Sequence, residues 1–181
     1  MIDIYDKMFG EFQISASRVE ILPIYHIEGG EWEEFNQYRK GIPIQGFANQ
    51  DWIEQLTAWK KSGKEIKRIR VIPTTLTEYL RYELEWCYPQ NCIAGEMIKI
   101  VDQKNYEQLV IPETEGDFWL FDNKYVLQMN YNKDGRYIDE KLVNEQNLIN
   151  KYIDLWVKLE QKSIPYKDFW KTQDKVRYNN Q

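Results

Sequence analysis

The sequence has little of what catalytic thiol, imidazole and zinc sites are built from. Its 181 residues contain one histidine, His26, and two cysteines, Cys87 and Cys92. Structural zinc takes four ligands, usually as two closely spaced pairs, so a single C-x4-C pair predicts two reduced thiols rather than a metal site. A lone imidazole beside an expected edge strand is more typical of a surface or packing residue than of a general base. We therefore expect no metal and no cofactor.

The motifs that anchor common enzyme classes are also missing. No G-x-G-x-x-G, G-x-x-x-x-G-K-S/T, H-E-x-x-H or G-x-S-x-G pattern occurs, so dinucleotide, phosphate-loop, zincin and serine-hydrolase chemistry lack their anchors. No apolar run approaches the ~20 residues that cross a bilayer, and the N-terminus has no basic segment followed by an apolar one. These absences predict a cytoplasmic protein without membrane contact, and they favour a binding domain over an enzyme.

Aromatic residues are abundant instead, at 15% of the chain with seven tryptophans. Such side chains can offset the entropy lost on folding, and the length suits one domain. The formal net charge of −5 opposes general attraction to a phosphate backbone, although the basic segment KKSGKEIKRIR could act locally. Nucleic acid is therefore not an expected partner.

The order of apolar patterns predicts one α+β domain over residues 1–170, followed by a polar, mobile tail over residues 171–181. DFWLFD, YVLQMNY and RYIDEKLV are joined by short links with turn residues, which indicates a three-stranded antiparallel meander. The expected architecture is a mixed sheet that ends in this meander and is covered by helices. Further strands are expected at 18–25, 65–73 and 97–101, and helices at 31–41, 49–62, 76–87 and 147–159.

The segment TTLTEYLRYELEWCYP contains a capping box. Thr75 and Glu78 have its spacing, which predicts a helix that starts near Leu76 and ends before Pro89. Glu83 falls at the border between the buried and the wet face of this helix. A carboxylate at that position needs a cationic partner or water, because an unpaired buried charge is very costly.

Arginines on the preceding strand are the natural partners of that carboxylate. Strand alternation places Arg68 and Arg70 on one face, opposite Ile69 and Val71. Two guanidinium groups there could hold a carboxylate or a phosphate, or they could only form a solvated rim. Arg81 on the helix is a third candidate partner of Glu83.

Alternation also divides the string DFWLFD. It puts Phe118, Leu120 and Asp122 on one face and the remaining three residues on the other, and both faces are mainly apolar. This pattern is typical of a strand that is covered on two sides. Asp122 is expected to be a hairpin residue, whereas Asp117 could line a pocket at the start of the strand.

Several strings, in this order, resemble a bacterial family of domains of unknown function. They are R-V-E-I-L, I-R-V, L-R-Y-E-L, N-x-x-A-G-E and D-F-W-L-F-D, within residues 12–170. The family is abundant in actinobacteria and often encoded beside helix-turn-helix regulators, which implies a regulatory setting and no established activity. The strings point to a set of candidate ligand-binding residues that equally suits a buried network fixing the fold. The set is Arg70, Arg81, Tyr82, Glu83, Asn91, Glu96, Asp117, Trp119 and Asp122.

The hairpin segment and the amphipathic helix that follows it are similar to half of a phospholipase-D-like domain. Such enzymes attack phosphodiesters with a histidine from an H-x-K-x4-D motif. Glu113, Thr114 and Glu115 stand just ahead of DFWLFD, where that histidine and lysine would be expected. The likeness therefore implies a degenerate domain without its nucleophile.

Three hypotheses follow for function. The first is a non-enzymatic domain that binds a small polar ligand or a regulatory protein partner. The second is a small metal-dependent nuclease or phosphotransfer enzyme, with Glu83, Glu96 and Asp117 around a divalent cation. The third is a module that forms a homodimer through exposed aromatic side chains such as Trp32 and Trp52.

Overall fold

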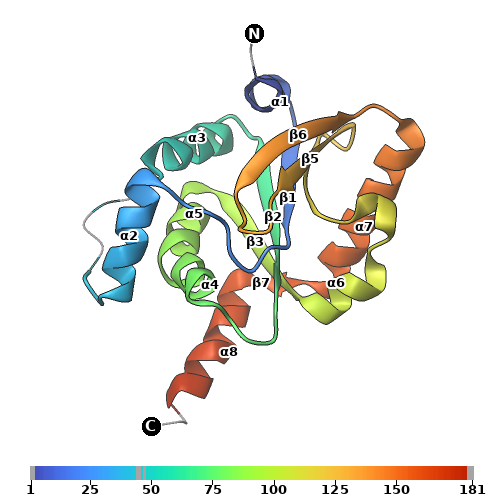
Figure 1. The fold of residues 1–181 in the computed structure, drawn as a ribbon. Coiled ribbons are helices and arrows are strands. Elements are labelled where there is room, and N and C mark those ends of the chain that lie inside the picture. Colours follow the sequence, from blue (N-terminus) through green and yellow to red (C-terminus); the bar gives the residue numbers. More distant parts are fainter. Residues whose placement is uncertain (1–2, 44–45, 47, 179–181) are drawn as a thin grey trace.

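A seven-stranded mixed sheet forms the centre of the protein (Figure 1), in the order β6-β5-β4-β1-β2-β3-β7. The structure, a computed structural model, describes residues 3–43, 46 and 48–178, with side chains up to residue 173. The first three strands pair in parallel, and β4, β5 and β6 add an antiparallel meander beside β1. The strands are β1 (Ser15–Glu20), β2 (Glu65–Ile72), β3 (Glu96–Asp102), β4 (Asp117–Phe121), β5 (Tyr125–Tyr131), β6 (Tyr137–Val143) and β7 (Ile164–Pro165).

Helices cover both faces of this sheet (Figure 1), so the predicted single α+β domain with a helix-covered mixed sheet is confirmed. Helices α6 (Gln103–Leu109) and α7 (Gln146–Lys162) pack on one face. The other face carries α1 (Ile4–Glu11), α3 (Gln50–Lys61), α4 (Glu78–Tyr82), α5 (Tyr88–Ala94) and α8 (Tyr166–Tyr178), and α2 (Gly29–Arg39) packs on α4. None of the helices described is long and apolar enough to cross a membrane.

The predicted alternation along β2 and β4 is confirmed. Ile69 and Phe118 enter the core beneath α6 and α7, whereas Trp119 packs in the core of the opposite face with α1 and α3. All five residues of β4 are buried, as expected for a strand covered on both sides. The strand expected at 18–25 instead spans Ser15–Glu20, because Pro23 cannot donate to a ladder and the chain leaves the sheet before it.

Asp122 is the hairpin residue that the sequence predicts. It and Asn123 have φ of 53°, in the left-handed region that tight hairpin turns use. The Asp122 carboxylate accepts backbone N–H bonds of 2.8, 2.7 and 2.8 Å from residues 13, 14 and 15. Burial works to raise the pKa of Asp122, but these three N–H donors lower it. Its role is to tie the hairpin to the start of β1.

The helix that begins after β2 runs further than predicted. Thr77, rather than Thr75, caps it by accepting from the Leu80 N–H at 3.1 Å. The helix then continues past Pro89 to Ala94 through a π-helical turn, η1 (Glu83–Cys87). The prediction that this helix ends before Pro89 is therefore wrong.

A distant side chain compensates for the proline. In the π turn the Tyr88 N–H donates to the carbonyl of Glu83, five residues back. By the same pattern, the carbonyl of Leu84 would accept from an N–H at residue 89. Proline has no such donor, and the Tyr166 hydroxyl of α8 donates to the Leu84 carbonyl instead.

The C-terminal elements agree in part with expectation. Tyr152, Leu155 and Leu159 of α7 are buried as predicted. The α8 backbone extends to Tyr178, and residues 179–181 lie outside the described chain. The expected mobility of residues 171–181 stays a prediction. Both cysteines are free and half-buried, and burial raises the pKa of each thiol.

Candidate ligand-binding cavity

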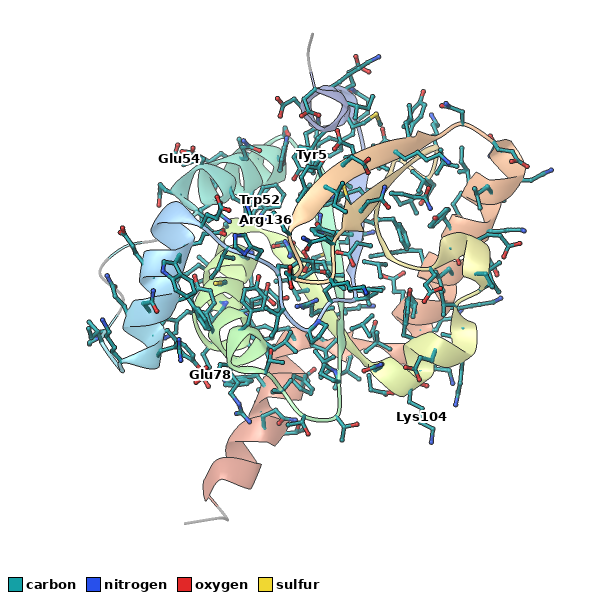
Figure 2. The ribbon with its side chains drawn as sticks, viewed as in Figure 1. Tyr5, Trp52, Glu54, Glu78, Lys104 and Arg136 are labelled. Atoms are coloured by element: carbon teal, nitrogen blue, oxygen red, sulfur yellow. The ribbon has the colours of Figure 1, made fainter. Side chains whose placement is uncertain are left out.

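A cavity of about 370 Å³ lies on the sheet face that carries α1, α3, α4 and α5. Its floor is formed by β1 and β2, and its walls come from the surrounding helices and from the β5–β6 hairpin. In Figure 2, Tyr5 and Trp52 lie where α1 and α3 approach that hairpin, while Lys104 lies on α6, away from this region. Much of the wall is aromatic, with Tyr5, Tyr25, Trp52, Tyr79, Tyr82, Tyr88, Trp119, Tyr131 and Tyr137.

The floor is a pair of arginines joined by one carboxylate. Arg18 of β1 and Arg68 of β2 are opposite each other in the parallel ladder. Glu20 bridges them, with 2.6 Å from its Oε1 to Arg18 Nε and 2.6 Å from its Oε2 to Arg68 Nη1. Burial alone would raise the pKa of Glu20, but the neighbouring arginines Arg68, Arg18 and Arg70 lower it to about 2. The carboxylate is therefore ionised at neutral pH.

Each floor arginine also contacts a second carboxylate. Arg68 Nε lies 2.7 Å from Glu96 Oε1, and the Asn91 amide donates to the other oxygen of Glu96 at 2.8 Å. Arg18 Nη2 lies 3.5 Å from Asp117 Oδ2. Asp117 also accepts from the Tyr25 hydroxyl at 2.5 Å. Burial raises the pKa of Asp117, and Arg18 opposes that rise.

A third arginine, Arg70, pairs with the carboxylate at the start of the π turn. Its Nη2 lies 3.0 Å from Glu83 Oε2, and the Tyr79 hydroxyl donates to Glu83 Oε1 at 3.2 Å. Burial raises the pKa of Glu83, and Arg70 counteracts this only in part. The prediction that an arginine of β2 pairs with Glu83 is confirmed.

The three arginines also stack on aromatic rings. Each guanidinium carbon lies over a ring centroid, at 5.2 Å for Arg18 on Trp119, 5.8 Å for Arg68 on Tyr88 and 5.0 Å for Arg70 on Tyr25. Stacking and ion pairing together fix the plane of each guanidinium group. The polar floor is thus rigidly oriented.

Several buried donors around this network have no hydrogen-bond partner among the described residues. They are Trp52 Nε1, Trp119 Nε1, the Tyr88 hydroxyl, and Nε and Nη1 of Arg70. Trp52, Trp119 and Tyr88 line the cavity with other atoms, because these donor atoms are fully enclosed by the protein. Leaving a buried donor unsatisfied costs about 1–3 kcal/mol.

The structure brings together most of the residues expected at a ligand site. Tyr82, Glu83, Asn91 and Trp119 line the cavity, and Arg70, Glu96 and Asp117 belong to the network beneath it. Two candidates fall elsewhere. Arg81 is half-buried and does not line the cavity, and Asp122 caps the start of β1.

The sequence did not identify Arg18, Glu20 or Tyr25 as site residues. Arg18 and Glu20 have the i, i+2 spacing that singled out Arg68 and Arg70, so the same alternation argument could have found them. Tyr25 lies in a segment without regular structure, where no periodicity indicates direction.

The carboxylates proposed to hold a divalent cation do not converge. Glu83, Glu96 and Asp117 each pair with a different arginine. Within the residues described, no three histidine, cysteine, aspartate or glutamate side chains are arranged to hold a metal ion. The three-carboxylate cation site of the alternative enzyme hypothesis is therefore not formed among the described residues.

The two tryptophans expected at a homodimer surface differ in environment. Trp32 is 48% exposed on α2, whereas Trp52 packs against Phe9 and Trp59 in the core between α1 and α3. Trp52 is thus engaged within the chain, and a homodimer stays a prediction.

Comparison with known proteins identifies a family and a fold. The model of a family described as a domain of unknown function (DUF6879) matches residues 3–171. No curated protein matches the chain. Among solved structures, a phospholipase D family member, Nuc from Salmonella typhimurium, is similar, with 12% identity and a TM-score of 0.50 over 88% of this chain and 86% of that one. At this identity the likeness concerns the fold alone, and it confirms the expected phospholipase-D-like architecture.

Proposed function

The chain belongs to this family of domains of unknown function, and we propose that it is a non-catalytic domain that binds a small ligand in the cavity. One observation carries the proposal: aromatic side chains and arginine–carboxylate pairs surround one cavity of about 370 Å³. Small-molecule sites combine apolar and aromatic walls with a few oriented polar groups in this way.

The residues just ahead of DFWLFD support a role without catalysis, because none of Glu113, Thr114 and Glu115 is a histidine or lysine. If Asp122 is taken as the aspartate of H-x-K-x4-D, the spacing puts the histidine position at Glu115 and the lysine position slightly later, at Asp117. The imidazole nucleophile and the adjacent cation of that motif are therefore both absent from these two positions. His26 does line the cavity, but its Nε2 lies 2.8 Å from Glu28 Oε1 and 2.7 Å from Arg136 Nη2. These contacts tie the imidazole to the loops at the rim.

The regulatory setting is part of the same proposal and comes from the family likeness noted in the sequence. The cavity joins α2, α3, the α4–α5 helix and the β5–β6 hairpin. A ligand in the cavity would therefore contact several surface elements together. A protein partner could recognise a change in how these elements are arranged.

A steric block of the cavity tests the proposal. Ala48 lines it and is exposed, and Ala48→Phe would place a ring at its mouth. A panel of nucleosides, nucleotides, amino acids, sugars and small carboxylates is offered to each protein and followed by saturation-transfer NMR. We expect at least one compound to bind the wild type, and the variant to lose that binding by 10-fold or more, because the ring occupies ligand space.

Ala58→Phe is the matched control. Ala58 is also exposed, lies on α3 and does not line the cavity, so this variant should bind as the wild type does. Equal loss in both variants, or no binding by the wild type, would contradict the proposal. Hydrolysis of bis(p-nitrophenyl) phosphate that disappears in His26→Ala would favour an enzyme instead.

A further inference from the structure

We infer that the cavity accepts an organic cation, an amine that carries no carboxylate or phosphate group. The inference rests on the proposed function and adds the chemistry of the ligand. It draws on a buried carboxylate at the cavity that no cation of the described chain neutralises, and on the pairing of the arginines nearby.

Glu34 of α2 differs from the other buried carboxylates of the described chain. Each of those, Glu20, Glu83, Glu96 and Asp117, lies within 3.5 Å of an arginine. Glu34 is only 8% exposed, yet among the residues described no lysine, arginine or histidine pairs with it. A buried carboxylate without a counter-ion is costly. A cation that enters the cavity from outside would supply the missing charge.

Neutral groups hold the Glu34 carboxylate in place. The Ala48 N–H donates to its Oε2 at 2.7 Å, and the Tyr82 hydroxyl donates to its Oε1 at 3.1 Å. These bonds fix the carboxylate at the cavity wall but leave its charge uncompensated. Each carboxylate oxygen has a second lone pair, so the same group can accept a further hydrogen bond from an ammonium group.

A second carboxylate adds to the negative charge of this wall. Glu31 lies one turn before Glu34 on α2, lines the cavity and is half-buried. The donor to its Oε1 is also neutral, the Asn49 amide at 3.1 Å. Burial raises the pKa of Glu31, and the negative charge of Glu34 raises it further. A cation beside the two carboxylates would relieve their repulsion.

The arginines at the cavity work against an acidic ligand. Arg18 and Arg68 line the cavity, and each already contacts two carboxylates. No lysine is among the described residues that line it. A carboxylate or phosphate on the ligand would therefore find no free cation, and it would meet the negative charges of Glu31 and Glu34.

Matched pairs of amines and amino acids test the inference. The panel used for the proposed function is extended with tyramine, tryptamine, agmatine and putrescine. Calorimetry on the full chain compares them with tyrosine, tryptophan, arginine and ornithine, which carry an additional carboxylate, and with 4-ethylphenol, which is tyramine without its amino group. We expect at least one amine to bind about 10-fold or more tightly than its parent amino acid, and 4-ethylphenol not to bind.

Substitution of Glu34 separates ligand binding from folding. Glu34→Gln keeps the shape of the side chain, and its amide can accept from the Ala48 N–H and donate to the Tyr82 hydroxyl. It should weaken amine binding by about 10-fold or more. The melting temperature of the free protein should stay unchanged or rise, because an uncompensated buried charge is removed. Glu20→Gln, which breaks a pairing with two arginines, should instead lower that temperature.

Glu33→Gln is the matched control for charge. Glu33 is exposed on the same helix and does not line the cavity, so this variant should bind the amine as the wild type does. Equal weakening in Glu33→Gln and Glu34→Gln would overturn the inference, because the net charge of the helix would then explain the attraction.

The remaining outcomes are distinguishable. Amines that bind no better than their parent amino acids, or that bind Glu34→Gln as well as the wild type, would overturn the inference. So would a melting temperature that Glu34→Gln lowers as much as Glu20→Gln does, since the carboxylate would then be compensated within the chain. If another compound of the panel binds through the cavity and amines do not, the ligand class is wrong and the proposed function survives. If no compound binds, both fail.

Discussion

At the scale of single residues, Glu20 is the centre of the polar floor. It contacts Arg18 and Arg68 at once, on two neighbouring strands. A buried ion network of this kind contributes little compared with apolar packing, but removal of one member leaves uncompensated charge. Glu20 should therefore matter more to stability than an exposed glutamate does, and its effect should depend on pH.

The pH dependence of Glu20 has a definite sign. Its pKa is about 2 in the folded protein against 4.5 ordinarily, so its stabilisation is complete above about pH 4.5 and lost as pH falls toward 2. We predict that Glu20→Gln lowers the free energy of unfolding by about 3 kcal/mol at pH 7. The gap to wild type should close by about pH 2, as measured by urea denaturation across that range.

Glu65→Gln is the comparison for that experiment. Glu65 is exposed on β2 and pairs with Lys67 at 2.7 Å, so its loss should cost less than about 1 kcal/mol. Burial raises the pKa values of Glu83 and Asp117, so their protonation stabilises the protein as pH falls. Glu83 and Asp117 are present in both proteins, so most of this opposite trend cancels when the free energies of unfolding of wild type and Glu20→Gln are subtracted. A gap that stays constant from pH 7 to pH 3 would refute the assigned role.

At the scale of elements, the π turn determines where the cavity wall lies. It carries Glu83 toward Arg70 and places Tyr88, which begins α5, over Arg68. Pro89 removes a donor at this point, and the Tyr166 hydroxyl supplies one from α8. The C-terminal helix is therefore coupled to the wall of the cavity through one hydrogen bond.

That coupling can be measured with a double-mutant cycle. Tyr166→Phe should lower the free energy of unfolding by about 1–3 kcal/mol, since it leaves the buried Leu84 carbonyl without its donor. In a Pro89→Ala background the new N–H at residue 89 can take over, and the same change should cost less than about 1 kcal/mol. Equal costs in both backgrounds, measured by chemical denaturation, would show that the two residues act independently.

The elements also show how far the sequence alone reaches. Alternation correctly placed Arg68 and Arg70 on one face of β2 and predicted β4 to be covered on both sides, because a strand's side chains follow its own period. The rule that a helix ends before a proline predicted the wrong end for the helix that contains Pro89. The compensating Tyr166 is 82 residues from Leu84, and no local pattern reveals a partner at that distance.

At the scale of the whole molecule, the cavity is a product of tertiary structure. Its lining comes from α1, β1, α2, α3, β2, the α4–α5 helix and the meander. The family string R-V-E-I-L contains Arg18 and Glu20, but the candidate set left both out. Their contacts form only when β1 pairs with both β2 and β4. The fold resembles that of a phospholipase D family member. The residues that form the floor of the cavity, however, are arginines and carboxylates paired with one another.

A crystal structure grown with the tightest-binding compound of the panel tests this account most directly. We predict electron density inside the cavity, in contact with side chains that line it, such as Tyr82 and Tyr131. The carboxylate pairs of Arg18 and Arg68 should remain in place. Density at any other surface, with the cavity empty, would contradict the claim that this cavity is the ligand site.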